Sequence, residues 1–314
     1  MRFSIVFIHR NNFESLRRAI DSVYKFIKKN DEIILVDNNS SDNSINRLRK
    51  LHYFKELKII KNKCNRGYAY GCNQGISLSS GEFIILCNND IWFQDNILEK
   101  ILVTFNSHND VGLIGPKIFD ARGNVVKSYN TQEINFLSQL DLGLKIFHKS
   151  NKCFDISEVK LLRGPLLAFR KNLVKDIGAM DEEFFFYHEE TEWCSRIFMS
   201  KKWKMLYDPR IAIYHYGGLS TSSNLLGSRI EFFRSRMVFW KKVFPIHKRI
   251  LILFINIPKL FIDLIFYFLL SSLTLFAKKK YVFKLKDRFY VICWLMIGKP
   301  DSWGLPDKCK VINH

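Results

Sequence analysis

Short apolar runs alternate with amphipathic segments through the first part of the chain. The runs are brief and unbroken, which predicts strands that are buried on both faces. Between them, apolar residues recur at helical spacing, as at Leu16, Ile20 and Val23. We therefore predict strands over 3–8, 32–36, 57–61 and 83–87, and helices over 13–28, 45–51 and 67–79. This alternation is typical of an α/β fold with a doubly wound, mostly parallel sheet flanked by helices, which binds ligands at the carboxyl ends of its strands.

The pattern becomes less regular in the middle of the chain. It predicts strands over 113–119 and 162–170, helices over 172–177 and 191–202, and a strand pair over 204–216. After residue 222 the composition shifts toward apolar and basic residues. We therefore divide the chain into an α/β domain over 1–222 and a C-terminal helical module over 223–314.

The C-terminal module is both apolar and basic. Residues 250–276 hold long aliphatic and aromatic runs, which Pro258, Lys259 and Asp263 interrupt, and basic residues flank the segment at 278–280. A membrane-spanning helix needs about 20 apolar residues with few charges, and the interrupted segment meets this requirement poorly. An apolar helix pair with basic rims instead favours association with the surface of an anionic leaflet. A true span and an ordinary helical subdomain packed on the sheet are the alternatives.

Composition and charge narrow the class of protein. The 314 residues are 47% hydrophobic and 25% charged, which is typical of a globular protein. The formal net charge of +19 favours polyanionic partners: nucleic acid, anionic lipid or phosphate-bearing substrates. The sequence contains no recognition helix, RNA-binding aromatic signature or zinc finger, so we expect no nucleic-acid partner.

The cysteines give no sign of a covalent framework. Their number is seven, they are scattered, and no Cys-x-x-Cys pair occurs among them. This predicts neither a disulfide framework nor a zinc site, and we expect reduced, mostly buried thiols in a cytosolic protein.

Three segments carry polar groups at the ends of predicted strands or the start of a helix. Asp37-Asn38-Asn39 follows the second strand, glycines punctuate Asn65 to Gly75, and Asn88-Asn89-Asp90 follows the fourth strand. Glycines at a loop-to-helix junction let backbone N–H groups approach a phosphate, and a strand with an amide and carboxylate tip suits a hard divalent cation. Each signal is weak alone, because an Asp after a strand is often a helix cap and the glycine spacing is neither a dinucleotide fingerprint nor a P-loop.

A fourth segment places several carboxylates among large aromatic residues. It runs from Asp181 to Cys194 and includes Glu189, Glu190 and Glu192. Burial among aromatic rings raises the pKa of a carboxyl group toward the range that suits a general base. A solvated surface carboxylate is the alternative for each of these acids.

In this order and spacing, the four segments resemble glycosyltransferase family 2, whose enzymes have the GT-A (nucleotide-diphospho-sugar transferase) fold. Within that family they resemble the rhamnosyltransferase-like branch of bacterial polysaccharide and lipopolysaccharide biosynthesis. The resemblance covers residues 3 to 220 or so and makes 1–222 the catalytic domain. It implies a metal-dependent, inverting transfer of a sugar, with rhamnose as a guess, from a nucleotide-diphosphate donor to a glycan or lipid-linked oligosaccharide acceptor. Together with the apolar and basic C-terminal module, this leads us to expect a peripheral protein on the cytoplasmic face of the inner or plasma membrane.

The resemblance assigns roles to individual residues. Asp37 would contact the nucleotide base, Gly67 and Asn73 would line the nucleotide pocket, and Asp90 would bind Mn²⁺ or Mg²⁺ with His215 as a second ligand. The family's aromatic-acidic pattern falls on Phe185 to Glu192, which makes Glu190 the catalytic base and Glu189 its neighbour. The further donor-binding candidates are Asn39, Arg66, Asn88, Asn89, Arg163 and Gly164.

The sequence departs from the family's pattern at three places. The metal motif keeps only its last carboxylate, Asp90, so the cation would also lean on the donor's phosphates. The base is Glu where the family usually has Asp, and Glu189 and Glu192 are rivals for that role. His9-Arg10-Asn11 stands where the family usually has Tyr or Trp before Asn. With an unperturbed pKa of about 4.3, Glu190 would be ionised at neutral pH.

Three other functions compete with this hypothesis. A pyrophosphatase-like or nucleotidyl-transferring protein would need nucleotide and metal but not the aromatic-acidic segment. A non-catalytic glycosyltransferase-like scaffold is credible because Asn88 and Glu190 depart from the family's pattern. A basic nucleic-acid-binding protein has only the net charge in its favour.

Overall fold

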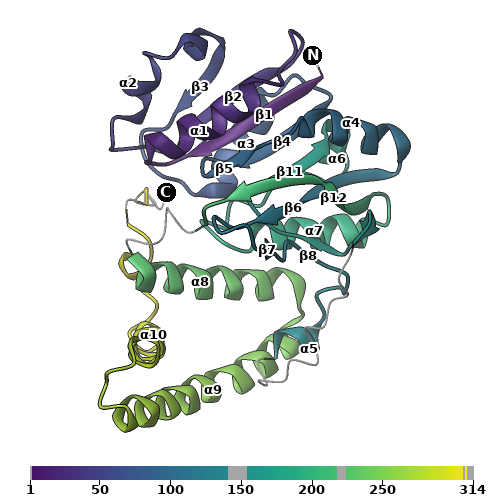
Figure 1. Cartoon of the computed structure of the whole chain (residues 1–314). Coiled ribbons are helices and arrows are strands. Elements are labelled where there is room, and N and C mark those ends of the chain that lie inside the picture. Colours follow the sequence, from purple (N-terminus) through teal and green to yellow (C-terminus); the bar gives the residue numbers. More distant parts are fainter. Residues whose placement is uncertain (1, 141–153, 218–223, 307, 310–314) are drawn as a thin grey trace. The chain divides into compact units, whose positions relative to one another are not determined.

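A computed structural model describes residues 2–140, 154–217, 224–306 and 308–309, and the chain divides into two compact units (Figure 1). Unit 1 comprises residues 1–133, 150–220 and 307–314, and unit 2 comprises 134–149 and 221–306. Two short segments therefore differ from the predicted division at residue 222. Residues 134–149 belong to unit 2, and the chain returns to unit 1 at residue 307.

Unit 1 is built around a 10-stranded mixed sheet. Its strands are β1 (Phe3–His9), β2 (Glu32–Asp37), β3 (Leu57–Lys61), β4 (Phe83–Asn88), β5 (Ile91–Phe93), β6 (Val111–Phe119), β7 (Val125–Val126), β9 (Ser157–Glu158), β11 (Leu166–Arg170) and β12 (Lys204–His215). The main path runs β3-β2-β1-β4-β11-β6-β12-β5, with β7 paired to β6 and β9 to β12. β1 to β4 are parallel, β11 is antiparallel to β4 and β6, β12 is parallel to β6, and β5 is antiparallel to β12. The short strands β8 (Tyr129–Asn130) and β10 (Leu161–Leu162) form a separate pair.

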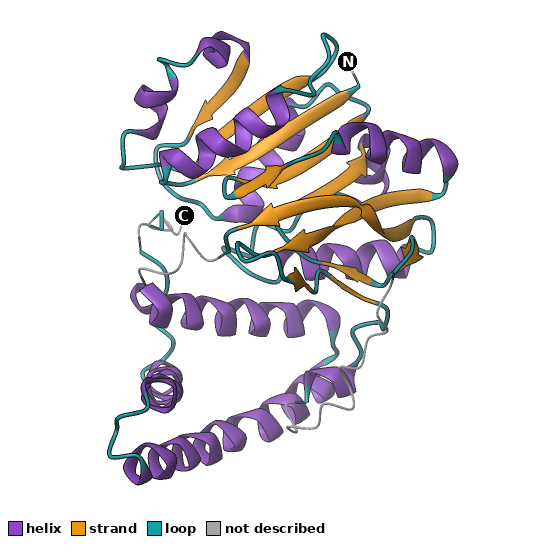
Figure 2. Ribbon diagram, in the orientation of Figure 1, coloured by secondary structure: helices purple, strands orange, loops and turns teal. Residues whose placement is uncertain are grey.

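Helices cover both faces of this sheet (Figure 2). They are α1 (Phe13–Tyr24), α2 (Ser44–Leu48), α3 (Tyr68–Leu78), α4 (Ile97–Ser107), α6 (Lys171–Ile177) and α7 (Glu189–Ser200), with a 3-10 turn over His52–Glu56. Side chains of α1 and α4 share one core with alternate residues of β1, such as Ile5 and Phe7. α3 packs against the other face so closely that a Cβ at Gly75 would lie 2.1 Å from Cγ1 of Val6.

The predicted α/β class, with a mostly parallel sheet between helices, is confirmed. Two strand predictions were wrong in detail. The strand predicted over 162–170 is broken at Arg163-Gly164-Pro165, because Gly164 has φ +123° and Pro165 has no N–H to donate. The strand pair predicted over 204–216 is the single strand β12, with a register irregularity between Asp208 and Ala212. Helix α4 was not predicted.

Unit 2 is helical. It contains α5 (Phe136–Gln139), α8 (Leu225–Val243), α9 (Ile246–Leu273), α10 (Lys279–Met296) and a 3-10 turn over Asp301–Trp303. Ile230, Leu260, Val291, Ile292 and Trp294 form its small core. Long helices α8, α9 and α10 replace the predicted helix pair.

Helix α9 runs without a break through the residues that the sequence marked as interruptions. Pro258 lies inside it, and the Lys259 ammonium lies 3.0 Å from the Asp263 carboxylate one turn later. Arg288 of α10 also reaches Asp263, at 3.1 Å. The two charges near the middle of α9 therefore pair with each other, and the helix also carries Lys248 and Arg249 near its start. Among the described residues, α9 is the one helix that is long and apolar enough to cross a membrane, judged by length and composition alone.

Candidate active site

The register of the parallel strands brings the predicted polar segments to one edge of the sheet. His9, the last residue of β1, pairs with Asp37 of β2, and Ile8 pairs with Asn88 of β4. The N–H of Asn88 donates to the carbonyl of Pro165, 2.8 Å away, so the turn before β11 reaches the same edge. The loops after β1, β2 and β4 therefore converge, as ligand sites of such sheets require.

Asp37 presents an acceptor that no described protein group uses. Its side chain is fully buried; one oxygen accepts the N–H of Ser40 at 3.0 Å, while Oδ2 has no hydrogen-bond partner among the described residues. Buried polar atoms are nearly always paired, so this oxygen points to a ligand. The next residue, Asn38, is instead structural, because its amide donates to the carbonyl of Gly67 at 2.9 Å. Asn39 adopts φ +64° in the same turn.

Gly67 begins the helix that the glycine pattern predicted. Its φ is +104°, and a Cβ there would lie 2.5 Å from the carbonyl oxygen of Phe185. That carbonyl accepts the N–H of Tyr68 at 2.7 Å. No residue with a side chain fits, so the glycine lets the aromatic-acidic segment pack against the start of α3. Beside it, the Arg66 guanidinium lies 3.8 Å from the centre of the Tyr70 ring.

Asn73, predicted to line the nucleotide pocket, uses its amide within the protein. Its Oδ1 accepts the N–H of Met180 at 3.1 Å, and its Nδ2 donates to the carbonyl of Met180 and to Glu182 at 2.8 and 2.9 Å. Asn73 therefore ties α3 to the loop that leads into the acidic segment. Its connection to a donor would be indirect.

The amide of Asn89 is held by His9, which the sequence marked as a departure from the family's pattern but gave no role. Asn89 Nδ2 donates to the carbonyl of Asn11 at 3.0 Å and lies 2.8 Å from Nδ1 of His9. Burial lowers the pKa of His9 to about 4, although Asp37 and Asp42 nearby act to raise it. The neutral ring accepts this hydrogen bond and fixes the loop that carries Asp90.

Asp90 and His215 lie together, as predicted for two ligands of one cation. Asp90 is 5% exposed, and its Oδ1 is 3.1 Å from Nε2 of His215. The N–H of Tyr216 donates to the Asp90 carbonyl at 3.1 Å, and β5 pairs Ile91 with His215. Trp92 stacks on Tyr214, with ring centres 5.0 Å apart, which holds the two strands together.

This pair fits a hard divalent cation only in part. Neighbouring ligands of an octahedral cation with bonds of about 2.1 Å lie about 3 Å apart, which matches the Asp90–His215 separation. Within the described ranges, however, no group of three or more His, Cys, Asp or Glu side chains forms a complete metal site. A cation held here would complete its coordination with phosphate oxygens and water.

The acidic segment starts helix α7 and separates its three glutamates by environment. Tyr187 and His188 adopt positive φ values of 73° and 67°, which turn the chain into the helix. Glu192, one of the alternative candidates for the catalytic base, pairs with Arg196, whose nitrogens lie 2.7 and 2.9 Å from its two oxygens. Glu189 and Glu190 each have an Oε2 with no hydrogen-bond partner in the described part of the chain.

Burial raises the pKa of Glu189 well above its ordinary value, and the Glu190 charge adds to the rise. Burial also raises the pKa of Glu190, while the Arg163 guanidinium acts to lower it. The raised pKa confirms the desolvation expected for this segment, whereas the ordinary pKa expected for Glu190 was wrong, because burial outweighs the effect of Arg163. Of the two, Glu190 has the cationic neighbour that favours its ionised form.

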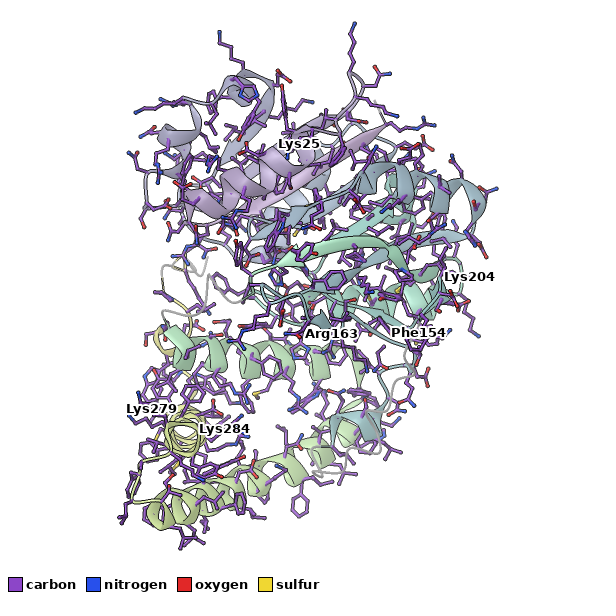
Figure 3. All side chains as sticks on the ribbon, viewed as in Figure 1. Lys25, Phe154, Arg163, Lys204, Lys279 and Lys284 are labelled. Atoms are coloured by element: carbon purple, nitrogen blue, oxygen red, sulfur yellow. A yellow bond between two sulfur atoms is a disulfide. The ribbon has the colours of Figure 1, made fainter. Side chains whose placement is uncertain are left out.

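The turn before β11 brings Arg163 to this pair. The N–H of Arg163 donates to the carbonyl of Ser128 at 2.7 Å, and its side chain is exposed (Figure 3). Gly164 has φ +123°, a conformation that residues with a side chain rarely adopt, so this turn needs a glycine. The carbonyl of Pro165 accepts the N–H of Asn88, so the turn that carries Arg163 lies at the edge of the sheet where Asp37 also lies.

The prediction of uniformly reduced cysteines was wrong. Cys64 and Cys309 form a disulfide, although 245 residues separate them. Cys72, Cys87 and Cys194 are buried free thiols, as expected, and Cys293 is a half-buried one. Cys153 lies outside the described residues.

Comparison with known proteins gives one family and one fold. The sequence model of Glycosyl transferase family 2 matches residues 4–178. The low-salt glycan biosynthesis hexosyltransferase Agl10 of Haloferax volcanii is 25% identical over 197 residues, which are 62% of this chain and 60% of that protein. The N-acetylglucosaminyl-diphospho-decaprenol L-rhamnosyltransferase of Mycobacterium tuberculosis is 22% identical over 227 residues, 66% of this chain and 73% of that protein.

Among solved structures, the mannosyltransferase of Pyrobaculum calidifontis, in complex with GDP-Man and Mn²⁺, superposes with a TM-score of 0.57 at 14% identity. The match covers 96% of this chain and 87% of that one. GalNAc-T7 with UDP, GalNAc and Mn²⁺ gives a TM-score of 0.54 at 16% identity, covering 68% of this chain and 44% of that one. These likenesses confirm the predicted GT-A fold.

The environments of the two glutamates predict the stability of a Glu189 variant. Because the folded pKa of Glu189 is raised, folding opposes its ionisation, and this loss of stability grows as pH rises above about 4.3. We expect Glu189→Gln to be more stable than wild type at pH 8 by about 1–3 kcal/mol, the range for a buried polar group without a partner. The gain should shrink at pH 4. Urea denaturation at both pH values measures it.

Glu82→Gln is the matched control, because Glu82 is an exposed carboxylate on the same unit. Its effect on the free energy of unfolding should be small and should not change between pH 4 and pH 8. A Glu189→Gln protein that is equally destabilised at both pH values would show that this carboxylate is paired in the folded protein.

Proposed function

Because the chain belongs to glycosyl transferase family 2, we propose that it transfers a sugar from a nucleotide-diphosphate donor to a hydroxyl group of a glycan or lipid-linked acceptor, with inversion at the anomeric carbon. The observation that carries the proposal is the Asp90–His215 pair at the carboxyl edge of the sheet. The same edge carries the Asp37 oxygen that has no partner among the described residues. It also carries the turn with Arg163, whose charge acts on Glu190. A donor, a cation and a base therefore have places on one unit.

Donor binding would use the groups that the loops after β2 and β4 present. Asp37 Oδ2 is a buried acceptor suited to N–H or hydroxyl groups of the nucleoside. Asp90 and His215 would hold Mn²⁺ or Mg²⁺, which when bound offsets the charge of the leaving diphosphate as a Lewis acid. The guanidinium of Arg66 lies at the start of α3, where it can also match phosphate geometry. The mannosyltransferase and GalNAc-T7 structures named above hold Mn²⁺, which supports a divalent cation here.

Proton transfer would fall to Glu190. Its raised pKa brings its basicity closer to neutral pH, where a general base is most effective, and Arg163 favours its ionised form. Glu190 would take the proton of the acceptor hydroxyl as the hydroxyl oxygen attacks the anomeric carbon. The nucleoside diphosphate leaves from the opposite face, so one displacement inverts that carbon.

The donor sugar is a hexose or deoxyhexose in this proposal. The hexosyltransferase and L-rhamnosyltransferase relatives support it, at 25% and 22% identity. Rhamnose is the sugar that the family resemblance suggested, and a lipid-diphosphate-linked sugar is the acceptor class in the name of the rhamnosyltransferase relative. Glycan biosynthesis stands in the name of the hexosyltransferase relative, and the family resemblance favours cell-surface polysaccharide synthesis as the process.

Release of nucleoside diphosphate from a panel of nucleotide sugars tests the proposal. The panel pairs UDP-hexoses, GDP-mannose and dTDP-rhamnose with glycan and lipid-diphosphate-linked acceptors, in the presence of Mn²⁺. We expect one donor to be consumed and the product to have the inverted anomeric configuration by NMR. Glu190→Gln should lower kcat by about 100-fold or more, because it removes the general base.

Glu82→Gln, remote from the acidic segment, should keep wild-type turnover. If Glu190→Gln also turns over normally, Glu190 is not the base. If every donor remains unconsumed although nucleotide binds, the chain is the non-catalytic scaffold.

The exposed apolar surface of unit 2 supports a peripheral place on the cytoplasmic face of an anionic membrane. Phe254, Ile262 and Leu273 of α9 are 74%, 65% and 82% exposed. Monomeric soluble proteins rarely leave such a stripe in water. The exposed residues Lys278–Lys280 follow the helix, and Lys279 stands at one end of α10 (Figure 3). Apolar side chains beside a basic cluster suit the headgroup region of an anionic leaflet.

Surface binding fits α9 better than spanning does. Lys259 and Asp263 lie near the middle of the helix and pair with each other and with Arg288 of α10. A charge at the centre of a bilayer costs about 2.5–3.5 kcal/mol even by insertion scales. If α9 lies in the headgroup region, Lys259 and Asp263 keep their contacts with each other and with Arg288 of α10. The exposed apolar side chains of α9 can then enter the lipid.

Vesicle sedimentation tests the membrane proposal. The triple variant Lys278→Gln, Lys279→Gln, Lys280→Gln should weaken binding to phosphatidylglycerol vesicles about tenfold or more, since each lysine near the surface contributes about 1 kcal/mol. The matched triple variant Lys25→Gln, Lys28→Gln, Lys29→Gln removes the same charge from unit 1 (Lys25 is labelled in Figure 3) and should bind as wild type does. Equal losses in both variants would show that net charge alone attracts the vesicles. Absence of binding to any vesicle would exclude the membrane surface.

A further inference from the structure

The disulfide brings a late part of the chain to the loop in front of α3. Cys309 is bonded to Cys64, and its N–H donates to the carbonyl of Asn65 at 2.9 Å. Lys308 and Asn65 form a parallel β-bridge. We call Lys308 and Cys309 the strap. All of these residues belong to unit 1.

The strap also contacts the aromatic-acidic segment. Nζ of Lys308 lies 4.5 Å from the centre of the Phe185 ring, within reach of a cation–π interaction. Phe185 in turn holds the start of α3, because its carbonyl accepts the N–H of Tyr68 and lies against Gly67. The strap therefore binds the two loops whose contact depends on Gly67.

Those two loops carry residues of the candidate active site. The carbonyl of Gly67 accepts the amide of Asn38, the neighbour of Asp37, and Arg66 lies between the disulfide and the helix. The other loop leads from Phe185 into Glu189 and Glu190. A displacement of either loop would move donor-binding groups and the acidic segment together.

The strap is held by the covalent bond, by the hydrogen bond from the N–H of Cys309 to Asn65 and by the contact of Lys308 with the Phe185 ring. A backbone hydrogen bond and a cation–π contact are each weak when solvent reaches them. Cys64 and Cys309 are only half-buried, unlike the buried thiols Cys72 and Cys87. A thiol can therefore reach this bridge, and bridges of cytosolic proteins are usually transient or redox-sensing.

We propose that the strap positions the donor-binding loop and that the Cys64–Cys309 bridge makes donor affinity depend on redox state, with the oxidised form binding more tightly. The affinity part rests on the proposed function; the ordering of the loop does not. A dithiol reductant opens the bridge by thiol–disulfide exchange. One reductant thiolate attacks a bridge sulfur and forms a mixed disulfide, from which the second displaces the remaining cysteine. Two electrons pass to the bridge, both cysteines gain protons, and the reductant leaves as a cyclic disulfide.

The test compares the full chain in oxidised form and after treatment with dithiothreitol. Peptide mapping without reductant verifies the bridge. Hydrogen exchange of peptides containing residues 64–68 and 185–188 reports the order of the two loops. Calorimetry with UDP, dTDP and GDP in the presence of Mn²⁺ reports affinity. Reduction should speed exchange in both peptides and raise the Kd of the nucleotide that binds about tenfold, the equivalent of ordering roughly one backbone residue.

Variants separate the bridge from general effects of thiols. Cys309→Ser should behave like the reduced protein with or without dithiothreitol, and Cys293→Ser, which removes a free cysteine of unit 2, should respond as wild type does. Lys308→Met should raise Kd, and Lys308→Arg should restore it, because arginine keeps the cation over the Phe185 ring.

The proposal is overturned if the bridge does not form under oxidising conditions. It is also overturned if reduction leaves both loop exchange and Kd unchanged. Should no nucleotide bind either form, the affinity part fails together with the proposed function. The exchange of residues 64–68 then still decides whether the strap orders the loop.

Discussion

Parallel pairing of β1 with a strand on each side creates the edge on which every candidate group depends. All seven residues of β1 are buried, and its register sets His9 beside Asp37 and Ile8 beside Asn88. Since side chains alternate between faces along a strand, a slip of one residue would turn the core residues Ile5 and Phe7 toward α3. Burial of this strand therefore fixes the register, and the register fixes which polar groups meet. The close contact at Gly67 adds the acidic segment to that edge.

The chain keeps several buried polar atoms without partners at this edge, and this placement opposes stability. Asp37, Glu189 and Glu190 each have such an oxygen among the described residues. Elsewhere in unit 1 the buried carboxylate of Glu32 contacts a cation as well as hydroxyl and N–H groups. Glu32 accepts from Ser4, Ser80 and Lys58, and these hydrogen bonds outweigh burial and lower its pKa to about 2. Glu32 is therefore a structural carboxylate, whereas Asp37, Glu189 and Glu190 are suited to binding a ligand or accepting a proton.

Hydrophobic and polar patterns along the sequence predicted the bounds of individual strands and helices. The strands β1 to β4 and helix α3 lie close to their predicted bounds, because each is an unbroken apolar run or a periodic segment beside glycines and polar turns. Asp90 and His215 also lie together as the family resemblance implied. Contacts between residues far apart in the chain gave no recognisable pattern in the sequence. Asn73 bonds Met180 across 107 residues, and Cys64 joins Cys309 across 245.

The sequence indicated desolvation in the aromatic-acidic segment but did not show which of its carboxylates is buried without a partner. The raised pKa of Glu190 follows from its burial, and Lys259 pairs with Asp263 because helix α9 sets them one turn apart. Each effect depends on where a side chain lies in three dimensions. Composition and spacing gave the residues but not their surroundings.

Thermal unfolding with nucleotide sugars, with and without Mn²⁺, tests most directly whether Asp90 and His215 form a donor site with a cation. A ligand at one hundred times its Kd adds about 2.7 kcal/mol to the free energy of unfolding, which is readily measured. We expect one nucleotide sugar to stabilise the wild type only with Mn²⁺. Asp90→Asn should abolish that response, whereas Asp95→Asn, which changes an exposed aspartate nearby, should preserve it. Equal stabilisation of wild type and Asp90→Asn, or stabilisation that does not need the cation, would contradict the account.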